Sequence, residues 1–213
     1  KKAREMLDDA HLETCKIVAS NALDEYLIRD LLMQGAQIDT FGVGERLITS
    51  KSDPVFGCVY KLAAVENENG TIIPKIKVSE NTAKITNPHF KRVYRLFDNE
   101  SGKALADELC IHDERISEDC PHTIFDPETT WKTKTLTNFT AKELLVPVFR
   151  GGTCVYEIPP LNAVKAYCAE QVESLWDEVK RFENPHKYYV DLSRRLWDVK
   201  HALLEKNKQG KPD

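Results

Sequence analysis

The chain has 213 residues and a formal net charge of −4, from 30 basic and 34 acidic side chains. Hydrophobic residues make up 41% and charged residues 30%, an ordinary globular composition. A slightly acidic chain argues against a general nucleic-acid binder, because phosphate backbones attract a basic surplus. No apolar run approaches the roughly 20 residues that span a bilayer. The charged start KKAREMLDDA also lacks the apolar core of a secretory signal.

The cysteines indicate a reducing compartment. Six cysteines stand apart from one another, mostly in apolar stretches: Cys15, Cys58, Cys110, Cys120, Cys154 and Cys168. This spacing is typical of free thiols and not of a disulfide framework. Together with the absence of a secretory signal, it predicts a cytoplasmic protein.

The first ten residues predict a helix that has no capping residue before it. Ala3, Met6, Leu7 and Ala10 recur at helical spacing from the first turn onward. An uncapped start suggests that residue 1 is not a natural beginning. We therefore expect a piece of a longer polypeptide, the alternative being a natural helical N-terminus that has lost a few residues.

A strand, a helix and a second strand follow within residues 16–44. Residues 16–20 form a short apolar strand, and Ser20 or Asn21 is expected to cap the next helix. Gly35 is expected to end this helix, before a strand at 38–44. The spacing fits a βα unit of a barrel or a doubly wound sheet. The helix should bury one apolar face, formed by Leu23, Leu27, Ile28, Leu31 and Leu32.

The middle of the chain predicts three antiparallel hairpins. Their turns are Asn69-Gly70, residues 98–102 and Gly151-Gly152, each between apolar runs. Residues 112–140 look irregular, with a turn at Asp126-Pro127. We divide the chain into residues 1–54 with the βα units, a β-rich region at 55–158 and a helical region at 159–213.

The last third predicts two helices. An apolar stripe runs from Leu161 to Phe182, and Asn184-Pro185 interrupts it. A second helix should begin near Asp191 or Ser193. In the connection between the helices, the hydroxyls of Tyr188 and Tyr189 are expected at the surface.

Two loops next to the first strands form a candidate phosphate pocket. Ser20 and Asn21 follow one strand, and Gly42-Val43-Gly44 ends the next. Glycine lets backbone N–H groups approach an anion, and a helix beginning at Glu45 or Arg46 would add its positive end. Neighbouring parallel strands place such loops on one rim. The plainer interpretation is that the glycines only turn the chain and that Ser20 and Asn21 only cap a helix.

The glycines also resemble part of a dinucleotide fingerprint. Leu47 occupies the third glycine position, and Glu66 mimics the acid that binds ribose. Too few residues separate Glu45 from Pro54 for the crossover helix of a parallel strand pair. This argues against nicotinamide-dinucleotide binding.

A second candidate is a zinc site formed by Cys110, His112, Cys120 and His122. Alternate residues of a strand share a face, so Cys110 and His112 could converge. The C-x-H spacing is not one of the common zinc spacings. The alternative is one buried cysteine with exposed histidines, and no nucleophilic triad can be assembled from spacing.

Five separated segments together resemble nicotinate phosphoribosyltransferases along essentially the whole chain. These segments are KIVASNALDE (16–25), IDTFGVG (38–44), GCVYKL (57–62), KITNP (84–88) and RFENPHKYYVDLS (181–193). The resemblance covers only the carboxyl-terminal part of that enzyme. It implies an α/β protein that contains the last βα units of an irregular phosphoribosyltransferase barrel, followed by an antiparallel β-rich region and C-terminal helices.

The resemblance also implies an activity. The family condenses nicotinate with phosphoribosyl pyrophosphate to nicotinate mononucleotide and pyrophosphate, in NAD salvage. ATP hydrolysis is coupled through a phosphorylated histidine, Mg²⁺ is usually required, and the enzymes are commonly dimers. The implied partners are the two substrates and the remainder of the same enzyme.

The resemblance implies substrate-binding roles for Ser20, Asn21, Gly42, Val43, Gly44 and Glu45. The phosphorylated histidine is expected upstream, so no residue here is assigned a catalytic or metal-binding role. Glu45 departs from the Thr that is often found there, and a carboxylate would repel phosphate. Other departures, at Ala22, Cys58 and His89, concern the shape of the loops.

Two alternatives stay open. One is another type II phosphoribosyltransferase acting on nicotinamide or quinolinate, although the 20–25 and 59–62 runs favour nicotinate. The other is a non-catalytic binding or oligomerisation module. Only two strong barrel strands are visible and a closed barrel needs about eight, so the isolated chain should be inactive.

Overall fold

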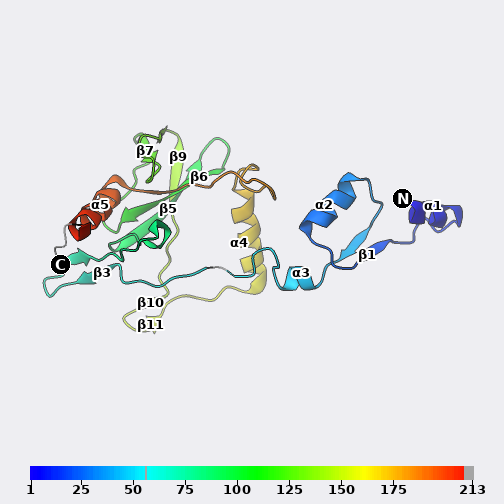
Figure 1. The fold of residues 1–213 in the computed structure, drawn as a ribbon, viewed down its shortest axis with the longest axis horizontal. Helices are drawn as coiled ribbons and strands as arrows, with labels where there is room; N and C mark the ends of the chain where they lie inside the picture. The colour runs from blue at the N-terminus through cyan, green and yellow to red at the C-terminus, as the bar shows by residue number, and fades with distance from the viewer. Residues whose placement is uncertain (56, 209–213) are drawn as a thin grey trace. The chain divides into compact units, whose positions relative to one another are not determined.

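The computed structural model describes residues 1–55 and 57–208 (Figure 1). The chain separates into two compact units, Lys1–Val59 and Tyr60–Asp213. The three-part division at residues 54 and 158 stays a prediction. Among the described residues, no helix combines the length and the apolar character that crossing a membrane would require.

The first unit contains a pair of parallel strands joined by a helix. Its elements are α1 (Lys2–Asp9), β1 (Val18–Ser20), α2 (Glu25–Met33), β2 (Thr40–Gly42) and α3 (Glu45–Ile48). β1 and β2 run parallel, so the predicted strand–helix–strand unit is confirmed.

The beginning of α2 differs from the prediction. Asp24 caps the helix, and its carboxylate accepts a hydrogen bond from the amide of Leu27 at 2.9 Å. Ser20 or Asn21 as the cap is therefore wrong, because the chain first turns through Asn21 and Ala22 with positive φ angles. The helix ends at Met33, and Gly35 follows with φ of 73° as expected for a left-handed C-terminal position.

The apolar face of α2 is only partly covered. Leu23, just before the helix, is buried, but Leu27 and Leu32 are 42% and 51% exposed. No residue within α2 itself is buried. The predicted burial is wrong in this unit because a two-stranded sheet of three-residue strands offers little surface against which a helix can pack.

The second unit is organised around a four-stranded mixed sheet with the order β12-β6-β5-β9. The central strands β5 (Lys91–Asp98) and β6 (Ala104–Ile111) form the predicted hairpin. β9 (Phe139–Glu143) is antiparallel to β5, and β12 (Val190–Leu192) is parallel to β6. Sequence analysis missed β12, which makes the sheet mixed instead of purely antiparallel.

The other two predicted hairpins are confirmed, although their strands are short. β3 (Ala64–Glu66) pairs with β4 (Ile72–Pro74) across the Asn69-Gly70 turn, and a 3₁₀ turn follows at Thr82–Lys84. Around Gly151-Gly152 the structure has β10 (Phe149–Arg150) and β11 (Thr153–Cys154).

A fourth hairpin lies in the region expected to be irregular. β7 (His122–Phe125) pairs with β8 (Thr133–Leu136). The prediction for residues 112–140 is therefore wrong in this part. The turn at Asp126-Pro127 is confirmed, because Asp126 accepts hydrogen bonds from the amides of Glu128 and Thr129. A side chain thus stabilises a connection that lacks a short glycine turn.

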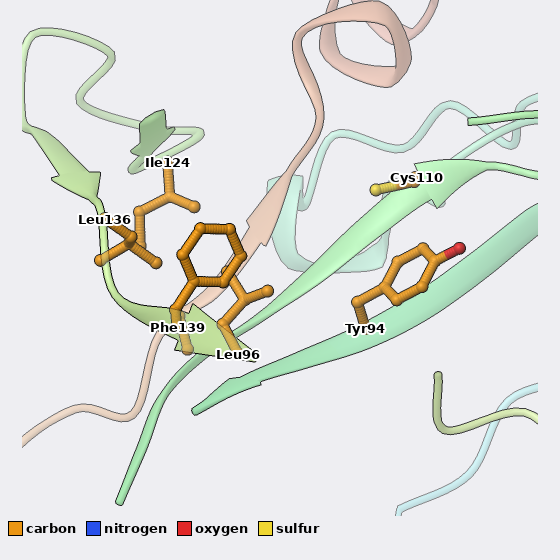
Figure 2. Packing of buried hydrophobic residues seen from close by; sticks show 7 residues of the cluster. Tyr94, Leu96, Cys110, Ile124, Leu136 and Phe139 are labelled. Carbon is orange, nitrogen blue, oxygen red and sulfur yellow. The ribbon is translucent and has the colours of Figure 1, made fainter. Parts of the chain in front are cut away.

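The core of the second unit lies between the sheet and the β7–β8 hairpin. Figure 2 shows Ile124 and Leu136 of the hairpin beside Phe139, with Leu96 of β5 close to the same ring. Tyr94 and Cys110 extend this cluster along the sheet, and Leu96 is fully buried. Closely packed side chains of this kind hold the hairpin over one face of the sheet.

Two helices complete the second unit. α5 (Arg194–Lys208) packs Leu196 against Leu192 and Ile111, and all three are buried. α4 (Leu161–Glu173) is shorter than the predicted stripe from 161 to 182 and has no buried residue. Its apolar side chains at 161, 164, 167 and 172 are exposed in the part of the chain that the structure describes.

A polar network joins the sheet to the segment before β12. Arg95 forms a two-point ion pair with Asp107, with nitrogen–oxygen distances of 2.8 and 2.9 Å. Tyr188 donates its hydroxyl to Asp107 at 2.9 Å. The expectation that this hydroxyl lies at the surface is therefore wrong, because Asp107 is buried and requires donors.

Candidate functional site

The parallel pair β1–β2 brings the two candidate loops together. Ser20 is the register partner of Gly42, so both strands end at the same edge (Figure 1). The carboxyl ends of parallel strands in α/β sheets are where ligands bind. The residues that follow these strands lie on one rim, as the sequence predicts.

Gly42 approaches the side chain of Ser20 so closely that a larger residue would force Ser20 to move. A Cβ atom on Gly42 would lie 3.1 Å from Ser20 Oγ and 3.2 Å from Ser20 Cβ. The Ser20 hydroxyl donates to the carbonyl oxygen of Gly42 at 3.2 Å. The glycine thus allows the two loops to approach closely, and the serine ties them together.

The loop after β1 has an uncommon backbone conformation. Asn21 has φ of 103° and Ala22 has φ of 48°. Positive φ is uncommon outside glycine, and two such residues in succession store strain that is typical of functional loops. The strain therefore supports a functional role for this turn.

The two loops surround a cavity of about 300 Å³. Five of the six predicted site residues line it: Ser20, Asn21, Gly42, Gly44 and Glu45. The sixth, Val43, lines a neighbouring cavity together with Asp24 and Ile28. The structure therefore brings five predicted residues together and directs the valine to another surface.

Gly44 caps α3, which begins at Glu45 as expected but has only four residues. The first amides of a helix have no acceptor within the helix. A Cβ atom on Gly44 would meet nothing within 4 Å, so the backbone is open to a bound group at this point. The cavity is suited to an anion contacted by backbone N–H groups.

Two basic residues in the same cavity were not among the predicted site residues. Arg46 and Lys51 both line it. The guanidinium of Arg46 forms an ion pair with Asp24, the residue that caps α2. A basic residue within a few positions of Gly42-x-Gly44 is the sequence signal that could have identified them. Their charges oppose the repulsion that Glu45 would exert on an anion.

The connection that follows Gly42-Val43-Gly44 is not that of a dinucleotide-binding unit. α3 is a single turn, and the next strand, β3, pairs antiparallel with β4 and not with β2. The described chain has no crossover helix after Gly42-Val43-Gly44. Glu66 ends β3 in a hairpin and does not follow a parallel strand.

The four candidate zinc ligands have separate environments. Cys110 lies in the hydrophobic cluster, and burial raises the pKa of its thiol. His122 Nε2 lies 2.6 Å from Glu108 Oε2, and Cys120 is exposed. Within residues 1–55 and 57–208, no three His, Cys, Asp or Glu side chains form a group that could hold a metal ion. The structure therefore gives the zinc hypothesis no support.

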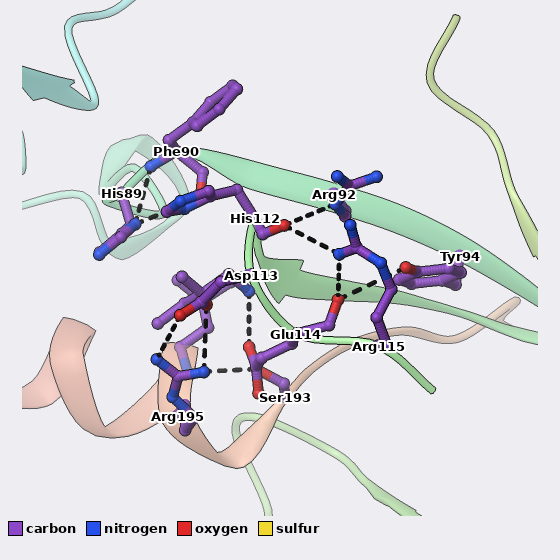
Figure 3. Close-up of polar contacts among 12 residues, drawn as sticks. His89, Phe90, Arg92, Tyr94, His112, Asp113, Glu114, Arg115, Ser193 and Arg195 are labelled. Carbon is purple, nitrogen blue, oxygen red and sulfur yellow. Dashed lines mark hydrogen bonds and ion pairs between the residues drawn. The ribbon is translucent and has the colours of Figure 1, made fainter. Parts of the chain in front are cut away.

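His112 belongs to a polar network at the end of β6. Figure 3 shows its ring beside those of His89 and Phe90, and its carbonyl oxygen accepts hydrogen bonds from Arg92 and Arg115. Glu114, also in Figure 3, accepts from the Ser193 hydroxyl at 2.7 Å. These contacts connect the sheet with the start of α5.

The fold and the cavity define an α/β protein with a cavity at the ends of two parallel strands. A family model described as "Nicotinate phosphoribosyltransferase C-terminal domain" matches residues 90–200. The chain belongs to the nicotinate phosphoribosyltransferase family.

Similar proteins extend this match along the chain. The nicotinate phosphoribosyltransferase of Bacillus subtilis (strain 168) is 40% identical over 208 residues, which cover 98% of this chain and 42% of that protein. That of Dictyostelium discoideum is 35% identical, over 91% of this chain and 33% of its own length. This chain thus spans less than half the length of these relatives.

A solved structure shares the fold. The crystal structure of human nicotinic acid phosphoribosyltransferase matches 95% of this chain and 36% of that chain, with a TM-score of 0.66 and 23% sequence identity. At this identity the match concerns the fold. It supports the mixed α/β architecture and the C-terminal helices.

Proposed function

We propose that this chain is the carboxyl-terminal part of an enzyme that converts nicotinate and phosphoribosyl pyrophosphate into nicotinate mononucleotide and pyrophosphate. In this proposal β1 and β2 are the last strands of an irregular barrel that the remainder of the enzyme completes. The names of the relatives support the reaction. The same proposal includes a cytoplasmic location in NAD salvage and a homodimer.

The cavity at the ends of β1 and β2 is the observation that carries the proposal. Its size, its open glycine backbone and its basic residues suit the 5′-phosphate of phosphoribosyl pyrophosphate. The amides near Gly44 and Glu45 would contact the phosphate, while Arg46 and Lys51 would offset its charge. Ser20 would hold the two loops at the required spacing.

Holding the phosphate contributes directly to the reaction. The bond from C1′ of ribose to pyrophosphate breaks, and the ring nitrogen of nicotinate forms the new bond to C1′. The sugar has oxocarbenium character as pyrophosphate leaves, so orientation and charge stabilisation supply most of the catalysis. The loops of this chain would position the ribose, and the phosphorylated histidine is expected in the upstream part.

Mg²⁺ and ATP belong to the proposal for the whole enzyme. The described residues offer no group of three side chains that could hold a metal ion. A hard cation such as Mg²⁺ prefers several oxygen ligands. Mg²⁺ usually binds through one or two carboxylates together with waters and substrate phosphates, and no step of the mechanism above passes through it.

The test uses the complete enzyme that contains this chain. Gly44→Val should raise the KM for phosphoribosyl pyrophosphate at least several-fold, because the new side chain would occupy the open space in the cavity. Gly57→Val is a matched control, since a Cβ there also meets nothing within 4 Å. Unchanged kinetics for Gly44→Val would remove this loop from the site.

Two further assays separate the alternatives. Nicotinamide and quinolinate, offered in place of nicotinate, should give much lower kcat/KM values. The isolated 213-residue chain should form no nicotinate mononucleotide, because two parallel strands cannot enclose the barrel site. Turnover by the isolated chain would contradict the proposal.

A further inference from the structure

A second cavity, of about 280 Å³, lies in the second unit at the edge of the four-stranded sheet. It is bounded by the β7–β8 hairpin and by the edge strand β12. Leu105, Ile124 and Phe125 give it an apolar wall, and the carboxyl groups of Asp126 and Asp191 also line it. Its volume lies just below the range of about 300–1,000 Å³ that is usual for small-molecule sites, so it would suit a small ligand.

One oxygen of the Asp191 carboxyl group is buried in this wall without a hydrogen-bond partner. Asp191 is 3% exposed, and the oxygen without a partner is Oδ1. The register partner of Asp191 on β6 is Glu108, which is also 3% exposed. Two carboxyl groups therefore lie side by side on neighbouring strands in a buried layer.

The neighbouring carboxylates all have donors. Glu108 contacts His122 at 2.6 Å, and Asp126 accepts from the amides of Glu128 and Thr129. Burial, with the nearby Asp126 and Glu108, raises the pKa of Asp191 to about 6. Most buried polar groups are satisfied, so an orphaned carboxylate beside a cavity indicates a partner from outside the chain.

The surroundings restrict what this partner can be. The described chain has no third ligand that would complete a metal site here. A carboxylate at neutral pH requires a ligand with N–H or O–H donors. The apolar wall favours a ligand with a flat hydrocarbon or heteroaromatic ring. Lys132 and Lys134, also in the cavity wall, carry positive charge that opposes any cation, so a cationic ligand must be small enough for its donors to reach Asp191 directly.

We propose that this cavity binds a small planar molecule bearing an amidinium or amino group, which donates N–H hydrogen bonds to Asp191 while its ring packs on Leu105, Ile124 and Phe125. The site is independent of the candidate phosphate pocket in the first unit. It does not depend on the function proposed for that pocket.

Benzamidine is the probe, because it combines an amidinium with a flat ring. We would titrate it into the 213-residue chain at pH 7.5 by calorimetry and by two-dimensional NMR. Benzoate, of the same shape with a carboxylate, is the ligand control. Asp191→Asn removes the charge at nearly constant volume, and Asp113→Asn removes an exposed carboxylate that pairs with Arg195.

The expected result is saturable binding of one benzamidine, with shifts at Ile124, Phe125 and residues 190–192. Asp191→Asn should weaken it about tenfold or more, which is the usual effect of losing a charged hydrogen bond. Asp113→Asn should leave it unchanged. A second variant, Leu105→Phe, fills the apolar wall without altering charge and should also weaken binding.

The pH dependence gives an independent readout. Binding should weaken as pH falls from 7.5 to 5, because Asp191 becomes protonated, and Asp191→Asn should remove most of this dependence. The other groups that face this region are Glu108, His122, Asp126, Lys132, Lys134 and Lys187.

Three results would overturn the proposal. The first is the absence of saturable binding, which is expected of a cavity that holds only water. The second is equal affinity for benzamidine and benzoate. The third is an unchanged affinity for benzamidine in a folded Asp191→Asn variant. Circular dichroism of each variant would establish that it is folded.

Discussion

Ser20 and Gly42 face each other at the ends of β1 and β2, and the serine hydroxyl donates to the glycine carbonyl at 3.2 Å. This contact fixes the distance between the two loops of the candidate phosphate pocket. A Cβ atom at position 42 would press on the Ser20 side chain, which would have to move by a few tenths of an ångström to make room.

Gly42→Ala should therefore separate the loops. We expect a several-fold higher KM for phosphoribosyl pyrophosphate in the complete enzyme, with a smaller effect on kcat, because the phosphate contacts would be misplaced. Adding Ser20→Gly removes the clashing atoms and should recover part of the loss. Steady-state kinetics of the two single variants and the double variant would check this coupling.

Glu45 should weaken phosphate binding through its charge. Glu45→Gln removes a carboxylate from the cavity wall and should lower the KM for phosphoribosyl pyrophosphate by a few-fold at low salt. Glu68→Gln, in the exposed turn between β3 and β4, should not change it. A KM for Glu45→Gln that is unchanged or higher would mean that the side chain turns away from the phosphate.

The Arg95–Asp107 pair should contribute strongly to the stability of the second unit. Arg95→Met leaves Asp107 buried with only the Tyr188 hydroxyl, so we expect a loss of about 2–4 kcal/mol in the free energy of unfolding. Arg195→Met breaks the exposed pair with Asp113 and should have little effect. Urea unfolding of the two variants would compare the buried and the exposed pair directly.

The stability of the chain should fall as pH rises from 5 to 8. Glu108 raises the pKa of His122, so the stabilisation from this pair is complete below about 6.5, the unfolded value, and is lost as pH rises through the raised pKa. Asp191, whose pKa is raised to about 6, destabilises the fold when it ionises. Both groups therefore lower the free energy of unfolding as the pH rises.

Urea midpoints measured at pH 5.5, 6.5 and 8 would check this. His122→Gln should flatten the profile above about pH 6.5, the unfolded pKa of histidine. Asp191→Asn should flatten it mainly between the ordinary carboxyl pKa of 3.8 and about 6, so a further measurement near pH 4.5 is included for this variant. A wild-type profile that rises over this range would contradict the assignment.

Local signals predicted the parts of the fold that depend on local chemistry. Asn69-Gly70 and Gly151-Gly152 specify tight turns, and two hairpins occur there. The ends of two neighbouring parallel strands determine where Ser20 and Gly42 lie, so the sequence predicts that both residues lie on one rim. Five of the nine residues that line the cavity could therefore be predicted from residues 16–45, whereas Arg46 and Lys51 could not.

The missed elements depend on contacts between distant residues. β12 has three residues, one of them the buried Asp191, so neither its length nor its pattern indicates a strand. The β7–β8 hairpin is closed by the side chain of Asp126 instead of a glycine turn. Asp24 competes with Ser20 and Asn21 as a helix cap, and only the backbone after β1 decides between them.

The parallel pairing of Val190 with Asp107 has a consequence for how the protein folds. The loop that joins these partners is long, and closing it costs entropy before the strand contacts repay it. During synthesis the β5–β6 hairpin can form early, but the free edge of β6 stays open until Val190–Leu192 have left the ribosome. A product truncated before residue 190 would keep that edge unpaired and would be prone to self-association.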